Sequence, residues 1–184
     1  MEWNQILRRQ SSWSSENADE LRLTPEEALV LYNDAPLHQL MTAAHQRRIA
    51  MHGPSTVTYL VDRNINYTNV CTINCQFCSF YRPPGHDGTY TQSYHEISNR
   101  IKELEQIGGS RILMQGGVNP DLDFSLYIDL IKYLVEEHPG IDLDCFSPIE
   151  IEGIAEVSGM STIEVLQQLK DAGLHGLPGG GAEM

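Results

Sequence analysis

The sequence after Gly53-Pro54 alternates between short apolar segments and amphipathic segments, and this alternation restricts the chain to a small group of folds. The apolar segments are rich in β-branched and aromatic residues or bounded by glycine, as is typical of strands. They read TVTYLVD (56–62), RILMQGG (111–117), IDLDCFSP (141–148) and GLHGLPGGG (173–181). Strands that alternate with helices form a parallel sheet with right-handed crossovers. The pattern predicts an α/β fold of about four parallel strands, either an open sheet or part of a TIM-like β/α barrel.

Helix-start signals precede the amphipathic segments. Ser93 with Glu96, and Ser161 with Glu164, have the spacing of a capping box, in which each side chain bonds the backbone of the other. A third helix is predicted in DFSLYIDLIKYLVEEHPG. These helices supply the crossovers between the strands.

The region before the barrel segment is divided into two parts. Residues 1–23 show no periodicity and are predicted to be a leader that is partly disordered. Residues 24–56 are predicted to form a helical extension, in which Thr24 and Glu27 cap one helix and Pro36 opens the next. Residues 57–184 then form the N-terminal half of the barrel. Because no helix follows the fourth predicted strand, we expect the sequence to be a truncated barrel.

Charge and hydropathy exclude several classes of partner. The formal net charge is -13 and the isoelectric point is about 4.8, so binding to nucleic acid or to an anionic membrane surface is not expected. No apolar run reaches the roughly 18 to 20 residues of a membrane span, and the first twenty residues lack the apolar core of a signal peptide. We therefore expect a cytoplasmic protein.

Three of the four cysteines lie within eight residues, as Cys71-x3-Cys75-x2-Cys78. Such a cluster is more typical of a metal site than of disulfides. A structural zinc would need a fourth ligand, for which His86 or His95 is near in sequence. A 4Fe-4S cluster has four irons, so three local thiolates would leave one iron open for another ligand.

Cys145 decides between two forms of the cluster hypothesis. If Cys145 were the fourth ligand, the protein would be an iron–sulfur electron carrier with no vacancy. Cys145 lies inside an apolar strand segment, and free cysteine is among the most buried residue types. The sequence therefore favours a core position for Cys145 and an open iron.

The cysteine spacing, with Phe77 before the third cysteine, resembles the cluster loop of the radical S-adenosylmethionine (radical SAM) superfamily. This resemblance implies that Cys71, Cys75 and Cys78 hold a 4Fe-4S cluster and that S-adenosylmethionine binds the fourth iron. The segments DRNINYTNVC, YRPPGH, QGGVNPDL and GGGAE further resemble the dehypoxanthine futalosine cyclase family of menaquinone biosynthesis. Aminofutalosine synthase and the deazaflavin cofactor synthases share the loop and GGGAE, so both remain alternatives.

The resemblance also implies roles for residues and partners outside the cluster. The positions implied to contact S-adenosylmethionine are Phe77, Gln115, Gly116, Gly117, Ser147 and Glu183. Each position also has a purely structural interpretation. Phe77 would exclude water, the glycines after Gln115 would form a turn that ends a strand, and Ser147 would belong to a Ser-Pro turn. The implied substrate is dehypoxanthine futalosine, whose ribose loses a hydrogen before the ring closes on the benzoate. The implied electron donor is a flavodoxin or ferredoxin, and no catalytic residue is assigned beyond the cluster.

Overall fold

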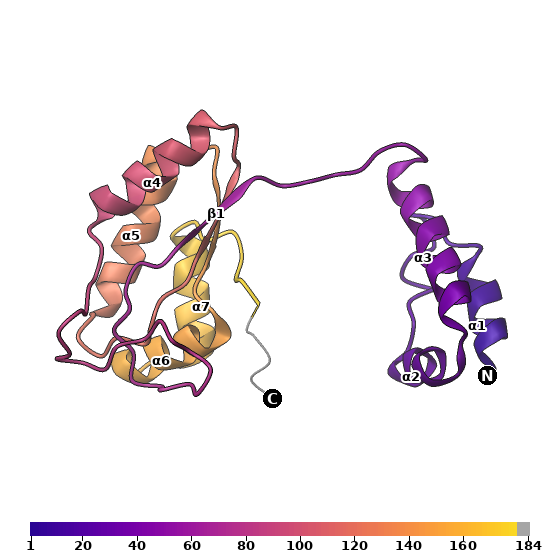
Figure 1. The fold of residues 1–184 in the computed structure, drawn as a ribbon, viewed down its shortest axis with the longest axis horizontal. Coiled ribbons are helices and arrows are strands. Elements are labelled where there is room, and N and C mark those ends of the chain that lie inside the picture. Colours follow the sequence, from indigo (N-terminus) through magenta and orange to yellow (C-terminus); the bar gives the residue numbers. More distant parts are fainter. Residues whose placement is uncertain (180–184) are drawn as a thin grey trace. The chain divides into compact units, whose positions relative to one another are not determined.

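The computed structural model describes residues 1–179, which form two compact units with the boundary after Tyr59. Helices α1 (Trp3–Gln10), α2 (Pro25–Asp34) and α3 (Leu37–His52) make up the first unit. The second unit contains, in chain order, β1 (Asp62–Ile65), α4 (Tyr94–Gln106), β2 (Arg111–Met114), α5 (Phe124–Glu137), β3 (Asp142–Cys145), α6 (Pro148–Ser158) and α7 (Thr162–Asp171). Figure 1 shows the helices and strands of each unit.

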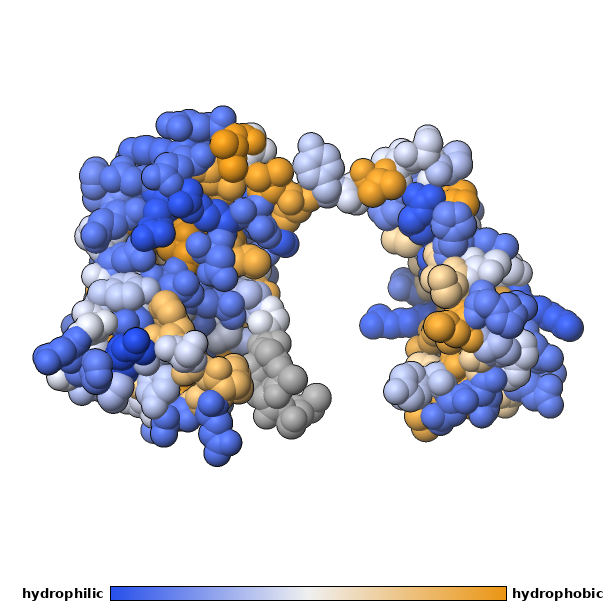
Figure 2. All heavy atoms as spheres, in the orientation of Figure 1, coloured by the Kyte–Doolittle hydropathy of each residue, from blue (hydrophilic) through white to orange (hydrophobic). Residues whose placement is uncertain are grey.

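The helical unit is held together by polar contacts at its first helix. Helix α1 lies within the segment expected to be a leader, and its Ile6 is fully buried. Both terminal nitrogens of Arg9 donate to the carboxylate of Glu27, at 2.7 and 2.6 Å. The capping box of Thr24 and Glu27 forms as predicted. Hydrophobic side chains also reach the surface of this unit (Figure 2). Leu29 and Tyr32 are among the large side chains that are exposed.

The sheet of the second unit is parallel throughout, with the order β1-β2-β3. This arrangement confirms the predicted α/β fold, a fragment of a TIM-like barrel. The first strand is Asp62–Ile65 and not the predicted segment 56–62. Val57 and Tyr59 are more than four-fifths exposed, and on this side β2 pairs with Asp62–Ile65, the segment that follows them. The apolar pattern therefore lies in the segment that precedes the strand, and not in the strand itself.

The predicted fourth strand begins to pair with β3 but does not form a strand within residues 1–179. A single parallel bridge joins Asp144 and Gly176. The Cys145 N–H donates to the Gly176 carbonyl at 3.0 Å, and the His175 N–H donates to the Leu143 carbonyl at 3.1 Å. The described sheet thus has three strands instead of four, and Pro178, two residues beyond Gly176, has no N–H to donate to β3.

The helices pack on one face of the sheet and bury the alternate strand residues (Figure 1). The strand side chains in this core are Ile65, Ile112, Met114, Leu143 and Cys145. Arg111 on the other face pairs with Asp62 at 2.7 Å and with Asp144 at 3.4 Å. One face is therefore apolar and helix-covered, and the other carries an ion-pair chain across all three strands.

Helix starts agree with the sequence where a serine cap was recognised. Ser93 and Ser161 accept hydrogen bonds from the backbone of Glu96 and Glu164. Helix α6 was not predicted, because Ser147-Pro148 was assigned to the loop after the third predicted strand. None of the helices in the described part of the chain is long and apolar enough to cross a bilayer.

Candidate active site

A cavity of about 440 Å³ lies at the carboxyl ends of the three strands. In a parallel α/β fold this edge is where ligands bind. The loops after β1, β2 and β3 all contribute to its lining, which consists of Cys71, Ile73, Cys75, Phe77, Cys78, Gln115, Gly116, Val118, Ser147, Ile149, Glu150 and Gly179. Most of the predicted site residues are therefore brought together. Gly117 lies behind this lining, and Glu183 lies outside the described residues.

The cysteine loop is closed at its base by backbone hydrogen bonds. The Cys71 N–H donates to the Arg82 carbonyl at 3.0 Å, and the Arg82 N–H donates to the Asn69 carbonyl at 2.7 Å. The Arg82 guanidinium also donates to the carbonyls of Ser79 and Tyr81, at 3.1 and 2.8 Å. These bonds fix the two ends of the loop while its thiols stay accessible.

Cys71, Cys75 and Cys78 are all half-buried and face the same cavity. Within residues 1–179, no three His, Cys, Asp or Glu side chains converge on a point that could hold a single metal ion. A 4Fe-4S cluster does not need such convergence, because each thiolate binds a different iron. Three soft, reachable donors around one cavity fit a cluster of this kind.

Neither candidate for a fourth zinc ligand lines this cavity. His86 is exposed in the loop after Arg82, and His95 is exposed on α4, where its ring bonds the Asn99 amide. Cys145 is fully buried in the core and is also absent from the cavity lining. Burial raises the pKa of its thiol well above the ordinary value, and nearby Glu150 and Asp144 act in the same direction.

The two glycines after β2 pack against the segment that leads into the cysteine loop. A Cβ on Gly117 would lie 2.1 Å from the Val70 carbonyl oxygen, and one on Gly116 would lie 2.7 Å from the Tyr67 ring. The Gln115 carbonyl accepts a hydrogen bond from the Asn66 amide at 3.0 Å. Only glycine allows this close approach, so the glycines are packing requirements as well as candidates for ligand contact.

Phe77 lines the cavity with 74% of its surface exposed. A ring this exposed excludes little water, and its surface is accessible for contact with a planar ligand. Ser147 has a different environment, because its hydroxyl donates to Glu150 at 2.7 Å and caps α6. Its hydroxyl proton is therefore directed at the carboxylate and not into the cavity.

The residue before Ser147 has an unusual backbone. Phe146 has a φ of 65°, in the left-handed region that bulky residues rarely adopt. It is fully buried, and its ring makes edge contacts with Tyr67 and Tyr127 at centroid distances of 5.6 and 5.4 Å. Packing on this aromatic cluster holds the turn that sends the chain from β3 into α6 beside the cavity.

Glu150 is the site residue that the sequence analysis missed. It is 3% exposed, lies in the first turn of α6 and lines the cysteine cavity. Burial raises the pKa of its carboxyl, and hydrogen bonds from Ser147, Gly116 and Tyr67 oppose that rise. A usable signal was present, because Ser147-Pro148-x-Glu150 is a capping box with proline at the first helical position.

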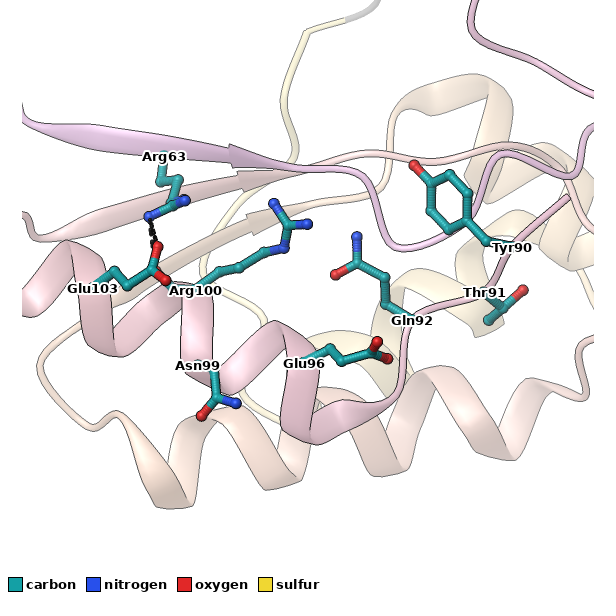
Figure 3. Close-up of a pocket in the computed structure, with 8 residues that line it drawn as sticks. All are labelled: Arg63, Tyr90, Thr91, Gln92, Glu96, Asn99, Arg100 and Glu103. Carbon is teal, nitrogen blue, oxygen red and sulfur yellow. Dashed lines mark hydrogen bonds and ion pairs between the residues drawn. The ribbon is translucent and has the colours of Figure 1, made fainter. Parts of the chain in front are cut away.

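A second cavity, of about 690 Å³, lies between β1 and α4, away from the cysteines (Figure 3). Arg63 and Glu103 form an ion pair of 2.6 Å across it. Its walls are charged and polar, and it contains no thiol. We therefore assign the chemistry to the smaller cavity, which holds the soft donors and the glycine backbone.

The fold and the cysteine site define a class of protein. The family model of the radical SAM superfamily matches residues 65–180, and the chain belongs to this superfamily. Members of the superfamily are enzymes that use a 4Fe-4S cluster and S-adenosylmethionine.

Several curated relatives are similar to the chain over most of its length. The chain is 45% identical over 163 residues to the cyclic dehypoxanthine futalosine synthase of Halalkalibacterium halodurans, covering 89% of this chain and 44% of that protein. It is 40% identical over 168 residues to the FO synthase of Streptomyces avermitilis, covering 90% and 19%. It is 39% identical over 161 residues to the 5-amino-6-(D-ribitylamino)uracil–L-tyrosine 4-hydroxyphenyl transferase of Methanococcoides burtonii, covering 88% and 44%. The chain thus spans less than half the length of these relatives.

Two solved structures share the fold. HydG, a maturase of the [FeFe]-hydrogenase, matches with a TM-score of 0.63 and 20% identity, over 94% of this chain and 38% of that chain. Methylornithine synthase (PylB) matches with a TM-score of 0.54 and 16% identity, over 96% and 57%. At these identities the similarity concerns the fold alone.

Proposed function

We propose that the full-length gene product cyclises dehypoxanthine futalosine in menaquinone biosynthesis. The type of chemistry rests on one observation, the position of three half-buried thiols around one cavity next to the Gly116 backbone. The substrate rests on the 45% identity to a cyclic dehypoxanthine futalosine synthase and on the segments around the cysteine loop. FO synthase and the tyrosine hydroxyphenyl transferase, at 40% and 39%, are the nearest competing assignments among the relatives described above.

In this proposal each part of the cavity holds a different portion of the cofactors. Cys71, Cys75 and Cys78 would bind three irons, and the backbone at Gln115–Gly117 would contact the methionyl part of S-adenosylmethionine. Phe77 would contribute an aromatic contact to the same ligand. When bound, the cluster and S-adenosylmethionine together supply a strongly hydrogen-abstracting adenosyl group.

The chain's own residues hold these groups and shield them. The hydrogen bonds of Arg82 keep the cysteine loop closed, and the apolar side chains of Ile73, Val118 and Ile149 form part of the cavity wall. An apolar wall protects reactive species from side reactions with water. The proposal includes a flavodoxin or ferredoxin as electron donor, and a cytoplasmic location.

The experiment uses the full-length gene product, assembled with iron and sulfide without oxygen and supplied with S-adenosylmethionine and a strong reductant. Dehypoxanthine futalosine deuterated at C4′ of the ribose is the substrate. We expect the cyclic product, and we expect the deuterium to appear in 5′-deoxyadenosine by mass spectrometry. The C4′ hydrogen must leave before that carbon can bond to the benzoate ring. The closed ring then loses one proton and one electron, and this electron balances the one consumed in the reductive cleavage of S-adenosylmethionine.

Parallel reactions test the competing assignments. One contains L-tyrosine with 5-amino-6-(D-ribitylamino)uracil, and another contains the enolpyruvyl ether of benzoate. Coupling in either reaction, with no conversion of dehypoxanthine futalosine, would replace the cyclase assignment by a transferase or by aminofutalosine synthase. Formation of 5′-deoxyadenosine in none of them would contradict the proposed function as a whole.

A further inference from the structure

Glu150 connects the chain segments that follow all three strands. Its Oε1 accepts hydrogen bonds from the Gly116 N–H at 2.8 Å and from the Tyr67 hydroxyl at 2.9 Å. Its Oε2 accepts from the N–H and the hydroxyl of Ser147, at 2.8 and 2.7 Å. Tyr67, Gly116 and Ser147 each lie two residues beyond the end of β1, β2 and β3. One carboxylate therefore links the three strand ends at the same level of the sheet.

These four hydrogen bonds leave Glu150 little capacity for a ligand. A carboxylate offers about four lone-pair positions, and in this structure each oxygen already accepts two bonds. The side chain is also 3% exposed. Glu150 is thus placed to hold the protein backbone, although it lines the cavity.

The other serine-capped helices of this unit show that the arrangement is more than a helix cap. Glu96 and Glu164 occupy the same capping-box position as Glu150, and each uses one oxygen to bond its own serine. Both of these glutamates are exposed, and neither is bonded to a strand end in the described residues. The bonds of Glu150 to Gly116 and Tyr67 are therefore additional to capping.

The Gly116 peptide belongs to a segment that packs against the cysteine loop. Gly117, the next residue, donates its N–H to the Thr68 carbonyl at 3.1 Å and lies against Val70 and Cys71. The Thr72 N–H donates to the Val118 carbonyl at 3.1 Å. Gly116 therefore lies in the stretch of backbone that packs beside the start of the cysteine loop at the cavity wall.

We propose that Glu150 is a positioning residue for the S-adenosylmethionine site, which acts by fixing the Gly116 peptide beside the cysteine loop. This inference rests on the proposed function, because it assigns the backbone at Gln115–Gly117 to the S-adenosylmethionine portion of the cavity. The cluster thiolates come from another loop that has its own closing bonds at Arg82. Loss of Glu150 is therefore expected to weaken S-adenosylmethionine binding more than cluster assembly.

The test compares Glu150→Met with Glu164→Met in the full-length protein. Methionine has a similar length but no carboxylate, and its sulfur is only a weak acceptor, so it removes the anchor at position 150 and only a helix cap at position 164. We expect both variants to assemble the cluster with wild-type iron content. We expect Glu150→Met to bind S-adenosylmethionine roughly 10- to 100-fold more weakly, a range typical for residues that support a ligand shell, and Glu164→Met to bind it normally. Binding is read from the change in the electron paramagnetic resonance spectrum of the reduced cluster during titration.

Hydrogen exchange provides a measurement that needs no cluster. In the wild-type protein the Gly116 amide should be protected like the neighbouring strands, and in Glu150→Met it should exchange faster while the core of β2 stays protected. Equal S-adenosylmethionine affinity in wild type and Glu150→Met, or equal losses of iron and affinity, would overturn the proposal. An unprotected Gly116 amide in the wild type would overturn it even if the variant fails to fold. If the wild type assembles no cluster, the proposed function fails, whereas exchange still tests the anchor.

Discussion

Gly117 lies so close to Cys71 that a Cβ on Gly117 would come within 2.6 Å of the Cys71 Cβ. The Val70 carbonyl oxygen would be closer still, at 2.1 Å. Backbone atoms cannot retreat as the end of a flexible side chain can, so any side chain at position 117 must displace the start of the cysteine loop. The position of the first thiol thus depends on a glycine from another loop.

We predict that Gly117→Ala displaces the cysteine loop and lowers the iron content below half of the wild-type value. Overpacking of this kind costs roughly 1–3 kcal/mol of unfolding free energy. Iron per chain and urea unfolding of the cluster-free protein measure the two effects. Gly140→Ala is the control, because a Cβ there meets nothing within 4 Å. Equal iron content in Gly117→Ala and Gly140→Ala would show that the loop tolerates the displacement.

We predict that the wild-type protein, assembled without oxygen, binds about four irons per chain. Cys71→Ala, Cys75→Ala and Cys78→Ala should each reduce this content severely, because each removes the ligand of one iron. Metal analysis and the visible absorption spectrum measure the loss. Stoichiometric zinc without iron after the same treatment would favour a structural zinc site instead.

Arg82 is predicted to hold the cysteine loop closed. Arg82→Ala removes the donors to the Ser79 and Tyr81 carbonyls and should increase hydrogen exchange over residues 72–81, with a stability loss of about 1 kcal/mol. Arg48→Ala is the matched control, since Arg48 also donates to two backbone carbonyls but lies in the helical unit. The role assigned to Arg82 is refuted if both variants leave exchange in the loop unchanged.

The capping glutamates are predicted to have opposite effects on the pH dependence of stability. Burial raises the pKa of Glu150, so its contribution is present below the ordinary glutamate pKa of about 4.3 and is lost as the pH rises through the raised value. Hydrogen bonds from Ser161 lower the pKa of Glu164, so its contribution is present above that ordinary value and is lost as the pH falls. The free energy of unfolding of cluster-free wild type, minus that of Glu150→Gln, should fall with rising pH. The same difference for Glu164→Gln should rise, and equal slopes would contradict the assignment.

Local signals in the sequence were sufficient for the parallel fold and for the serine-capped helices α4 and α7. They failed where the stabilising partner is distant in the sequence. Most residues of β1 are polar, so its sequence does not resemble a strand. One of them, Asp62, is paired with Arg111, which lies far along the chain. The segment 56–62 satisfied the strand pattern, yet β2 pairs with the residues that follow it.

The same contrast between local signals and partners distant in the sequence applies to the site. Cysteine spacing alone predicted that the three thiols lie around one cavity, since the pattern is contained in one loop, and their role as cluster ligands stays a prediction. The role of Glu150 depends on three residues from separate loops, and no periodicity links them in the sequence. Its capping-box signal predicts a helix start, and only the fold places that start against the ends of the other two strands.

The last prediction concerns thiol accessibility and separates an open-iron enzyme from an electron carrier. Cys71, Cys75 and Cys78 are half-buried and line the cavity, whereas Cys145 is fully buried among Met114, Leu143 and the helices. Burial also raises the pKa of the Cys145 thiol, so little thiolate is available there at neutral pH. Iodoacetamide should therefore label three cysteines in the cluster-free protein and spare Cys145 until unfolding.

Cluster assembly should protect the same three cysteines from labelling. Cys145→Ala should keep its iron and lose only about 1 kcal/mol of stability, because it shortens a packed side chain without removing a ligand. Mass spectrometry of the labelled peptides and iron analysis give the two results. Loss of iron in Cys145→Ala, or labelling of Cys145 together with the other three, would favour a fourth protein ligand. The fourth iron would then have no vacancy, and the chain would be better described as an electron carrier.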